Sequence, residues 1–413
     1  MRVTHLSLTN FRNYGRLEID FPAGATLLHG QNAQGKTNLL EAIYYLATTR
    51  SPHAIQDSQL LNWQAAQAPD PIVVGRLVAN VTTSAATRQI EMRLIQERRG
   101  NGSAGFRREA LVNRRKVRLM DVLGNLRVVL FLPEDVQLIT GPPSARRRYM
   151  NATLCQVDPA HCHALSQYNK ILEQRNALLR QLAEGQGSRE LLAIYTEQLV
   201  EWGSQIFARR AQFFEEIGRD AQRIHYEELT DGRELLRLQY APRLAAPQNG
   251  APTADVNSWL PAGERERRLL AQRFGEQMRA SRRADIARGA TNLGPHRDDW
   301  RMEVNGRDLG SFGSRGQQRT AILALKLAEI HWMITVTGET PVLLLDEVVA
   351  ELDEQRRERL LASVQNAAQA ILTATDPGMF ANAFLQNATS MTVANGRVTL
   401  NQSDGKQDGS EQK

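Results

Sequence analysis

The feature that constrains this chain most is the stretch from Gly30 to Thr37, which reads Gly-Gln-Asn-Ala-Gln-Gly-Lys-Thr. It has the spacing of a phosphate-binding loop, in which two glycines flank four residues and are followed by Lys and Ser or Thr. Residues 25–29 have the pattern of a buried strand that enters the loop, and residues 38–46 that of an apolar helix that leaves it. Glycines let backbone N–H groups turn toward an anion, and the helix N-terminus adds partial positive charge. We therefore expect the chain to bind a nucleoside triphosphate.

The loop residues have different expected roles. Lys36 would reach the outer phosphates, and the Thr37 hydroxyl would hold Mg²⁺. The full set expected to contact ATP is Gly30, Gln31, Asn32, Ala33, Gln34, Gly35, Lys36, Thr37 and Asn38.

An apolar strand ending in two carboxylates, residues 341–347, has the character of the second half of a nucleotide site. Such a strand can present Asp346 to the Mg²⁺ shell, while Glu347 polarises the attacking water. Together with the loop, it predicts a catalytic set of Glu347, Asp346 and Lys36, with Thr37 and Asp346 as the metal ligands.

A second anion-binding helix end is predicted at Ser314, Arg315, Gly316, Gln317 and Gln318, ahead of a helix over residues 319–333. One triphosphate has no obvious use for two such ends in one chain. In a head-to-tail dimer, however, each Ser-Arg-Gly end can close over the γ-phosphate bound by the partner. The turn 350–353, which ends in Asp353, is placed to meet the loop of the partner.

Charge points toward a polyanionic partner, because the formal net charge is +6. Basic residues cluster at 98–99, 107–108, 114–118, 146–148 and 282–283. Several basic clusters on a nucleotide-binding protein favour nucleic acid. The predicted DNA contacts are Arg114, Arg115, Lys116, Arg146, Arg147 and Arg148. The last three could equally be structural and anchor carboxylates.

Length and composition fit a soluble, cytoplasmic protein of two or three domains. The chain has 413 residues and two cysteines, which suit a reducing cytosol. The N-terminus lacks the apolar core of a signal peptide. No apolar run stands out at the ~20 residues that a membrane span needs.

Periodicity predicts the remaining elements. Two helices, marked by apolar stripes over 165–182 and 192–206 around a turn at 184–188, should form a hairpin. Hairpin turns are expected at 305–306 and 395–396, a Pro-rich loop at 240–263, a basic helix at 264–288 and a disordered tail at 401–413. Strands are predicted at 3–8, 17–21, 71–78, 89–95, 109–117, 128–132, 300–304 and 370–375.

Taken together, the motifs resemble the ABC-type ATPases. The resemblance implies an α/β fold: a P-loop head with a mixed sheet, flanking helices and an antiparallel N-terminal sheet, into which a compact helical domain is inserted. It implies head segments at 1–140 and 289–400, an insertion at 141–288 and a tail at 401–413. In that family a glutamine senses Mg²⁺, and Gln56 and Gln59 are both candidates. A switch histidine should follow strand 370–375, but this sequence has Asp376.

Residues 8–14 and 35–44 are similar to the SMC-like DNA-repair ATPases, and residues 141–150, 168–179 and 294–299 to the bacterial RecF family. This resemblance implies a mediator that dimerises on ATP, binds gapped DNA and acts with RecR and RecO. Such a protein helps load RecA onto gaps coated by single-strand-binding protein, in repair, replication restart and the SOS response. Its ATPase would be weak and DNA-stimulated. The alternative is an ABC-type subunit of a transporter or of a nuclease-coupled system.

Overall fold

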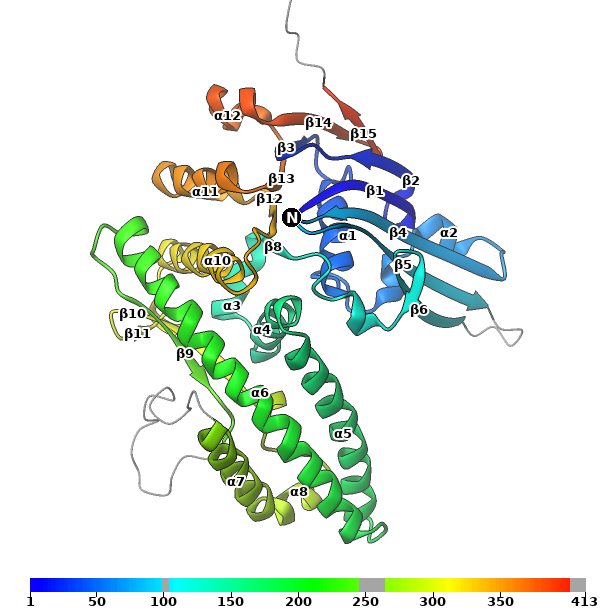
Figure 1. Ribbon diagram of the computed structural model, residues 1–413, viewed down its shortest axis with the longest axis vertical. Helices are drawn as coiled ribbons and strands as arrows, with labels where there is room; N and C mark the ends of the chain where they lie inside the picture. Colours follow the sequence, from blue (N-terminus) through cyan, green and yellow to red (C-terminus); the bar gives the residue numbers. More distant parts are fainter. Residues whose placement is uncertain (99–103, 245–263, 402–413) are drawn as a thin grey trace, which may run out of the picture. The chain divides into compact units, whose positions relative to one another are not determined.

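The structure, a computed structural model, describes residues 1–98, 104–244 and 264–401 (Figure 1). The chain divides into two compact units. The first, here called the sheet unit, comprises Met1–Pro133, Glu339–Arg357 and Leu361–Lys413; the second, the helical unit, comprises Glu134–Gly338 and Glu358–Leu360. The predicted boundaries at residues 140 and 288 stay a prediction, because compactness and not function defines these two units.

An antiparallel sheet forms one layer of the sheet unit, in the order β2-β1-β4-β5-β6-β7. The strands are β1 (Arg2–Phe11), β2 (Tyr14–Asp20), β4 (Ile72–Thr82), β5 (Thr87–Arg98), β6 (Ala104–Val112) and β7 (Arg115–Val117). The first two strands, predicted at 3–8 and 17–21, are present and pair antiparallel as β1 and β2. The single strand predicted at 109–117 is wrong, because Asn113 and Arg114 adopt φ of 50° and 65° and turn the chain between β6 and β7.

A mixed sheet forms the other layer, in the order β15-β14-β3-β13-β12-β8. Its strands are β3 (Gly24–His29), β8 (Val128–Phe131), β12 (Val342–Asp346), β13 (Gln369–Ala374), β14 (Thr389–Ala394) and β15 (Arg397–Leu400). All neighbours pair in parallel except β14 and β15, which form the predicted hairpin. Because β3, β12 and β13 are parallel, their carboxyl ends lie at one edge of the sheet.

Helix α1 (Lys36–Thr48) contacts strands of both sheets, as Figure 1 shows. Buried residues occur on all sides of the helix, and Leu39, Ile43 and Leu46 are fully buried. Complete burial of each such side chain contributes about 1.5–3 kcal/mol. The helix that leaves the phosphate-binding loop is therefore anchored in the core of the unit. The shorter helices α2 (Trp63–Gln67) and α12 (Asn382–Asn387) also belong to the sheet unit, as does α11 (Glu354–Asn366) apart from Glu358–Leu360.

The helical unit contains the predicted hairpin, formed by α5 (Pro159–Ala183) and α6 (Arg189–Arg223). Leu192, Leu199 and Ile206 of the predicted stripe are buried. The basic helix predicted at 264–288 divides at Ser281 into two helices. The other helices of this unit are α3 (Gln137–Thr140), α4 (Pro143–Val157), α7 (Glu264–Ala280), α8 (Arg282–Arg288), α9 (Leu309–Phe312) and α10 (Arg315–Thr337).

A three-stranded antiparallel sheet, β11-β10-β9, also belongs to the helical unit. It comprises β9 (Leu236–Ala241), β10 (Asp299–Val304) and β11 (Arg307–Asp308), and the turn predicted at 305–306 is confirmed. Strand β9 corrects the predicted start of the Pro-rich loop, since Tyr240 is a buried strand residue. Most of that loop and of the predicted tail lie outside the described residues.

Within the described chain, α10 is the one helix long and apolar enough to cross a membrane. Of its most apolar 18-residue window, 72% is buried inside the protein. The helix contacts α4 and α6. Its apolar composition is therefore accounted for by packing within the helical unit.

Candidate functional site

The backbone of the phosphate-binding loop is shaped by its two glycines. Gly30 has φ 149° and Gly35 has φ 112°. A Cβ on Gly30 would lie 2.2 Å from the carbonyl oxygen of Val393 in β14, and one on Gly35 would lie 2.5 Å from Asn13 Nδ2. Neither position has room for a side chain. Glycine is thus required by the close approach of two neighbouring segments as well as by φ.

Those two segments also hold the loop by hydrogen bonds. Tyr14, the first residue of β2, donates to Gly35 O at 2.9 Å, and Asn13 Nδ2 in the preceding turn donates to Gln34 O at 3.0 Å. From the β14–β15 hairpin, the N–H of Asn395 donates to Gln34 Oε1 at 2.6 Å. Burial raises the pKa of Tyr14 far above its ordinary value, so its hydroxyl stays protonated and donates. The loop is braced from both sides.

Lys36 and Thr37 begin α1 and connect the loop to the acidic strand. Lys36 Nζ donates to Gly30 O at 2.7 Å and lies 3.1 Å from Glu347 Oε1. Thr37 Oγ1 donates to Asp346 Oδ1 at 3.0 Å. The two carboxylates follow the loop by about 310 residues in the sequence, and the structure brings them to the loop, as the motifs predict.

Asp346 and Glu347 are held by Thr373 at the end of β13. Thr373 Oγ1 donates to Asp346 Oδ1 at 2.7 Å and accepts from the N–H of Glu347 at 2.9 Å. Glu347 has φ 51°, a left-handed conformation that is uncommon outside glycine and that clusters at functional sites. Sequence reasoning missed Thr373, although a polar residue within a buried apolar strand is a visible signal.

The surroundings of Asp346 suit a hard cation. Burial raises the pKa of Asp346 above its ordinary value, and the hydrogen bonds from Thr373 and Thr37 act in the opposite direction. Asp346 as a whole residue is 7% exposed. A cation beside it would offset the cost of burying this carboxylate. The Thr37 hydroxyl and the Asp346 carboxylate are oxygen ligands of the kind that Mg²⁺ prefers, and so the residues present fit the predicted metal.

The segment that follows α1 bonds to Glu41 of that helix and also influences Asp346 electrostatically. Arg12 forms a two-bond ion pair with Glu41, at 2.7 Å for each bond, and Ser51 Oγ donates to Glu41 Oε1 at 2.5 Å. Ser51 in turn accepts from the N–H of His53 at 3.0 Å. The electrostatic influence of His53 acts to lower the pKa of Asp346. His53 is therefore a residue of the site surroundings that carried no motif in the sequence.

The two glutamines predicted as Mg²⁺ sensors, Gln56 and Gln59, lie at a short 3-10 helix, Asp57–Leu60, which follows α1 in the chain. Gln59 Oε1 accepts from the N–H groups of Ile55 and Gln56, at 3.0 and 3.3 Å. Its carboxamide therefore serves as a local cap, and Gln56 is exposed.

Asp376, in the position predicted for a switch histidine, is exposed and accepts from the N–H of Gly378 at 2.8 Å. The neighbouring strand β3 ends at His29, which lies opposite Ala374 of β13. Burial lowers the pKa of His29, and the charges of Asp376 and Lys36 act on it in opposite directions. Asn38, another predicted loop residue, donates to Asn13 Oδ1 at 2.8 Å.

The second predicted anion-binding end lies in the helical unit. Ser314 caps α10, since its Oγ accepts from the N–H of Gln317 at 3.2 Å, and Gln317 Oε1 accepts from the N–H of Ser314 at 3.0 Å. Arg315 and Gly316 are exposed, whereas Gln318 is buried. The helix begins at Arg315, four residues earlier than predicted, because this reciprocal cap fixes its first turn.

Asp353, predicted at the dimer turn, caps another helix. It is the N-cap of α11 in the sheet unit, where its Oδ1 accepts from the N–H of Arg356 at 3.1 Å.

The basic residues predicted to contact DNA differ in exposure. Arg114, Arg115 and Lys116 are exposed at the β6–β7 turn, and Lys116 pairs with Glu109. Arg146 is buried and binds Asp299 through two hydrogen bonds of 2.5 and 2.9 Å. Its geometry is that of the structural alternative, because a buried, paired guanidinium is not accessible to DNA.

Its two neighbours are more accessible. Arg147 donates to Asp298 O at 2.7 Å, and Arg148 is exposed.

Comparisons with known proteins show the family to which this sequence is similar. A family model described as the RecF/RecN/SMC N terminal domain matches residues 2–399. The DNA replication and repair protein RecF of Chloroflexus aurantiacus is 40% identical over 406 residues, covering 96% of this chain and 99% of the relative. That of Herpetosiphon aurantiacus is 38% identical over 405 residues, with the same coverage of both chains.

Solved structures of RecF are also similar to this chain. Two structures of the recombination mediator protein RecF in the RecFOR pathway, described as RecF-ATPrS and RecF-ATP, each match with TM-score 0.80 and 29% identity. Each match covers 97% of this chain and 97–98% of the other.

Proposed function

The chain belongs to the RecF family of DNA replication and repair proteins, and we propose that it is a recombination mediator that binds DNA when ATP joins two copies of it. The observation that carries this proposal is that the phosphate-binding loop and the acidic strand meet in the sheet unit. There, Thr37 bonds to Asp346 at 3.0 Å and Lys36 lies 3.1 Å from Glu347. A braced loop, a metal-type oxygen pair and a carboxylate for water activation together suit ATP hydrolysis.

ATP is the proposed nucleotide, and the description RecF-ATP of a 29% identical relative supports it. The loop N–H groups and Lys36 would bind the phosphates, while Thr37 and Asp346 would hold Mg²⁺. When bound, this cation would neutralise charge on the β- and γ-phosphates. Glu347 would orient and deprotonate the attacking water. We propose a weak, DNA-stimulated ATPase in which hydrolysis acts as a release step.

The assignment of the two predicted anion-binding ends to different units supports a dimer. The loop lies in the sheet unit and the Ser314 end in the helical unit. In our proposal, Ser314 to Gln318 of one copy close over the γ-phosphate held by the other, and Asp353 meets the loop of the partner. Hydrolysis removes this bridge and the dimer opens. The proposed domain organisation is a head at 1–140 and 289–400, with a helical insertion at 141–288.

DNA would bind the closed dimer mainly through its phosphates. Among the residues predicted from the sequence, we propose the exposed Arg114, Arg115, Lys116 and Arg148 as contacts. Membership of the RecF family supports gapped DNA as the target, RecR and RecO as partners, and RecA and single-strand-binding protein as functional neighbours. It also supports a cytoplasmic location.

The test measures binding to a gapped duplex and self-association with and without ATP in rising salt. We expect ATP to promote both in the wild-type protein, and Lys36→Arg and Asp346→Asn to abolish the ATP effect. Lys170→Arg is the matched control, because Lys170 is exposed on α5. If Lys36→Arg or Asp346→Asn dimerises normally with ATP, the shared-site model fails.

A further inference from the structure

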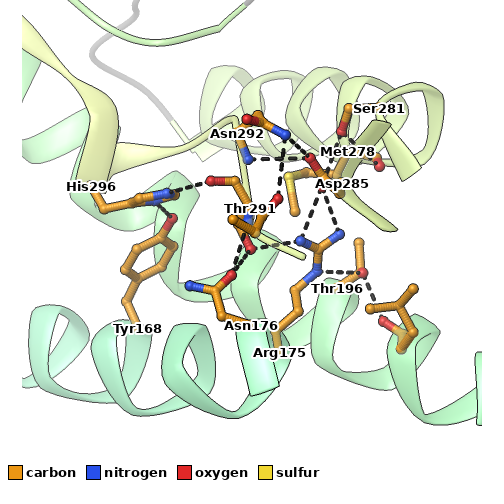
Figure 2. Close-up of polar contacts among 12 residues, drawn as sticks. Tyr168, Arg175, Asn176, Thr196, Met278, Ser281, Asp285, Thr291, Asn292 and His296 are labelled. Atoms are coloured by element: carbon orange, nitrogen blue, oxygen red, sulfur yellow. Dashed lines mark hydrogen bonds and ion pairs between the residues drawn. The ribbon is translucent and has the colours of Figure 1, made fainter. Parts of the chain in front are cut away.

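The short helix α8 is locked to the α5–α6 hairpin by a buried ion pair. Nη1 and Nη2 of Arg175 on α5 both donate to Asp285 Oδ2 on α8, at 3.1 and 3.0 Å, and both side chains are 0% exposed. Figure 2 shows the pair at the centre of a polar network. Arg175 also donates to Thr291 at 2.7 Å and to Thr196 at 3.2 Å.

The second oxygen of Asp285 is satisfied as well. Asn292 donates to Asp285 Oδ1 through its side chain at 2.8 Å and through its backbone N–H at 3.2 Å. Asn176 accepts from both the N–H and the hydroxyl of Thr291. A buried ion pair contributes little net stability compared with apolar packing, but its directional bonds accept one geometry. The network therefore fixes the orientation of α8 about its own axis.

That orientation gives α8 a basic outer face. The exposed residues of α8 are Arg283, Ala284, Ala287 and Arg288, here called the α8 face. At about 100° per residue these four positions cover an arc of about 140° around the helix, in which the two alanines lie between the two arginines. The single acid of α8 is Asp285, which points into the buried network (Figure 2). The α8 face thus carries two arginines and no carboxylate.

Neighbouring elements add further positive charge. Arg279 at the end of α7 is exposed and Arg282 is partly exposed. Among the described residues, Glu276 on α7 and Glu190 on α6 are exposed acids, and the pKa of Glu190 is lowered by a hydrogen bond from Ser188 and further by the charge of Arg282.

We propose that the α8 face binds the phosphate backbone of DNA. Arginine forms planar, paired hydrogen bonds with phosphate, and the two alanines allow a backbone to approach closely. A protein interface would be expected to have an apolar or aromatic centre, and on this face the only side chains besides arginine are methyl groups. The proposal rests on the proposed function and adds a second DNA contact, separate from the β6–β7 turn.

The test is the double variant Arg283→Ala/Arg288→Ala, with binding to a gapped duplex measured by fluorescence anisotropy with ATP at several salt concentrations. Losing two phosphate contacts should lower the slope of log affinity against log salt by about 2 and weaken binding at low salt by at least about tenfold. The control is Arg219→Ala/Arg223→Ala on α6, whose side chains are 70% and 44% exposed and pair with glutamates. We expect this control to retain wild-type binding.

The outcomes separate this inference from the proposed function. ATP-dependent dimerisation, measured on the same samples, should be unchanged in the double variant. If the wild-type protein binds DNA with ATP and the double variant keeps its affinity and salt slope, the α8 face is not a DNA contact. If the wild-type protein shows no ATP-dependent DNA binding, the proposed function itself fails. Since Arg288 also bonds to Asn292 at 3.1 Å, Arg283→Ala alone is the second variant and should lower the slope by about 1.

Discussion

The hydroxyl of Thr373 donates a 2.7 Å hydrogen bond to Asp346 and accepts a 2.9 Å bond from the N–H of Glu347. One buried hydroxyl at the end of β13 thus orients the proposed metal ligand and the proposed catalytic carboxylate of β12. Thr373 does not contact the nucleotide in this scheme and acts as a positioning residue.

Replacing Thr373 with Val should weaken both interactions while keeping the size of the side chain. We expect ATPase turnover to fall about tenfold, because one buried hydrogen bond to a charged group contributes about 1.5–3 kcal/mol. The concentration of Mg²⁺ needed for half-maximal turnover should rise. Thr373→Ser keeps the hydroxyl and should restore both values. A Thr373→Val protein with a normal Mg²⁺ requirement would contradict the positioning role.

Glu347→Gln should separate nucleotide binding from hydrolysis. The carboxamide is nearly isosteric but cannot accept a proton, and general-base catalysis contributes roughly 10²–10⁴ in rate. We expect turnover to fall at least about 100-fold while the ATP-bound dimer persists on size-exclusion chromatography. Glu354→Gln, an exposed residue at the start of α11, is the control. Unchanged turnover in Glu347→Gln would assign the base elsewhere.

The parts of the fold that the sequence predicts well depend on local chemistry. The loop between Gly30 and Thr37 has a fixed spacing, and the strand ending at Asp346 is apolar throughout. Both can be recognised in the sequence because each pattern involves only residues that are close together in the chain. The turn at Asn113 and Arg114 was missed because it contains no glycine, and left-handed φ at other residues is uncommon.

The remainder of the site depends on contacts between distant segments. Three features can be predicted only once the order of the strands in the sheets is known. They are the hydrogen bonds from Asn13 and Tyr14 to the loop, the bond from Thr373 to Asp346, and the electrostatic effect of His53 on Asp346. For Arg146 the sequence left a DNA contact and a structural ion pair equally open, because its partner, Asp299, lies 153 residues away. Sequence alone gives the charge of a residue but not its partner.

Asp285→Ala should strongly destabilise the helical unit. It leaves the guanidinium of Arg175 buried without its ion-pair partner, a change that typically costs about 3–5 kcal/mol. Urea unfolding followed by circular dichroism measures the loss, and Glu276→Ala, which removes an exposed acid from α7, is the control. The double variant Arg175→Met/Asp285→Leu should recover much of the stability, because apolar residues of similar size remove the unpaired charge. A loss below about 1 kcal/mol in Asp285→Ala would contradict the tight pairing.

The stability of the helical unit should fall in mild acid because of His296. Its Nδ1 lies 2.7 Å from the Tyr168 hydroxyl and its Nε2 lies 3.0 Å from Thr291 O (Figure 2). The neutral ring satisfies both contacts when Nε2 donates and Nδ1 accepts, whereas a second proton would face the hydroxyl hydrogen. Burial accordingly lowers the pKa of His296 to about 4, compared with about 6.5 in an unfolded chain.

Between these two values the unfolded chain binds more protons than the folded one, so the free energy of unfolding decreases as pH falls. The contribution of His296 is fully present above about pH 6.5, and about 3 kcal/mol of it is lost by pH 4. The measurement is urea unfolding at a series of pH values for the wild-type protein and His296→Gln. His161, whose pKa burial lowers to about 3, acts in the same direction in both proteins, so the difference between the two curves isolates His296. We expect the wild-type curve to fall more steeply between pH 6.5 and 4, and parallel curves would show that His296 is not held neutral by its partners.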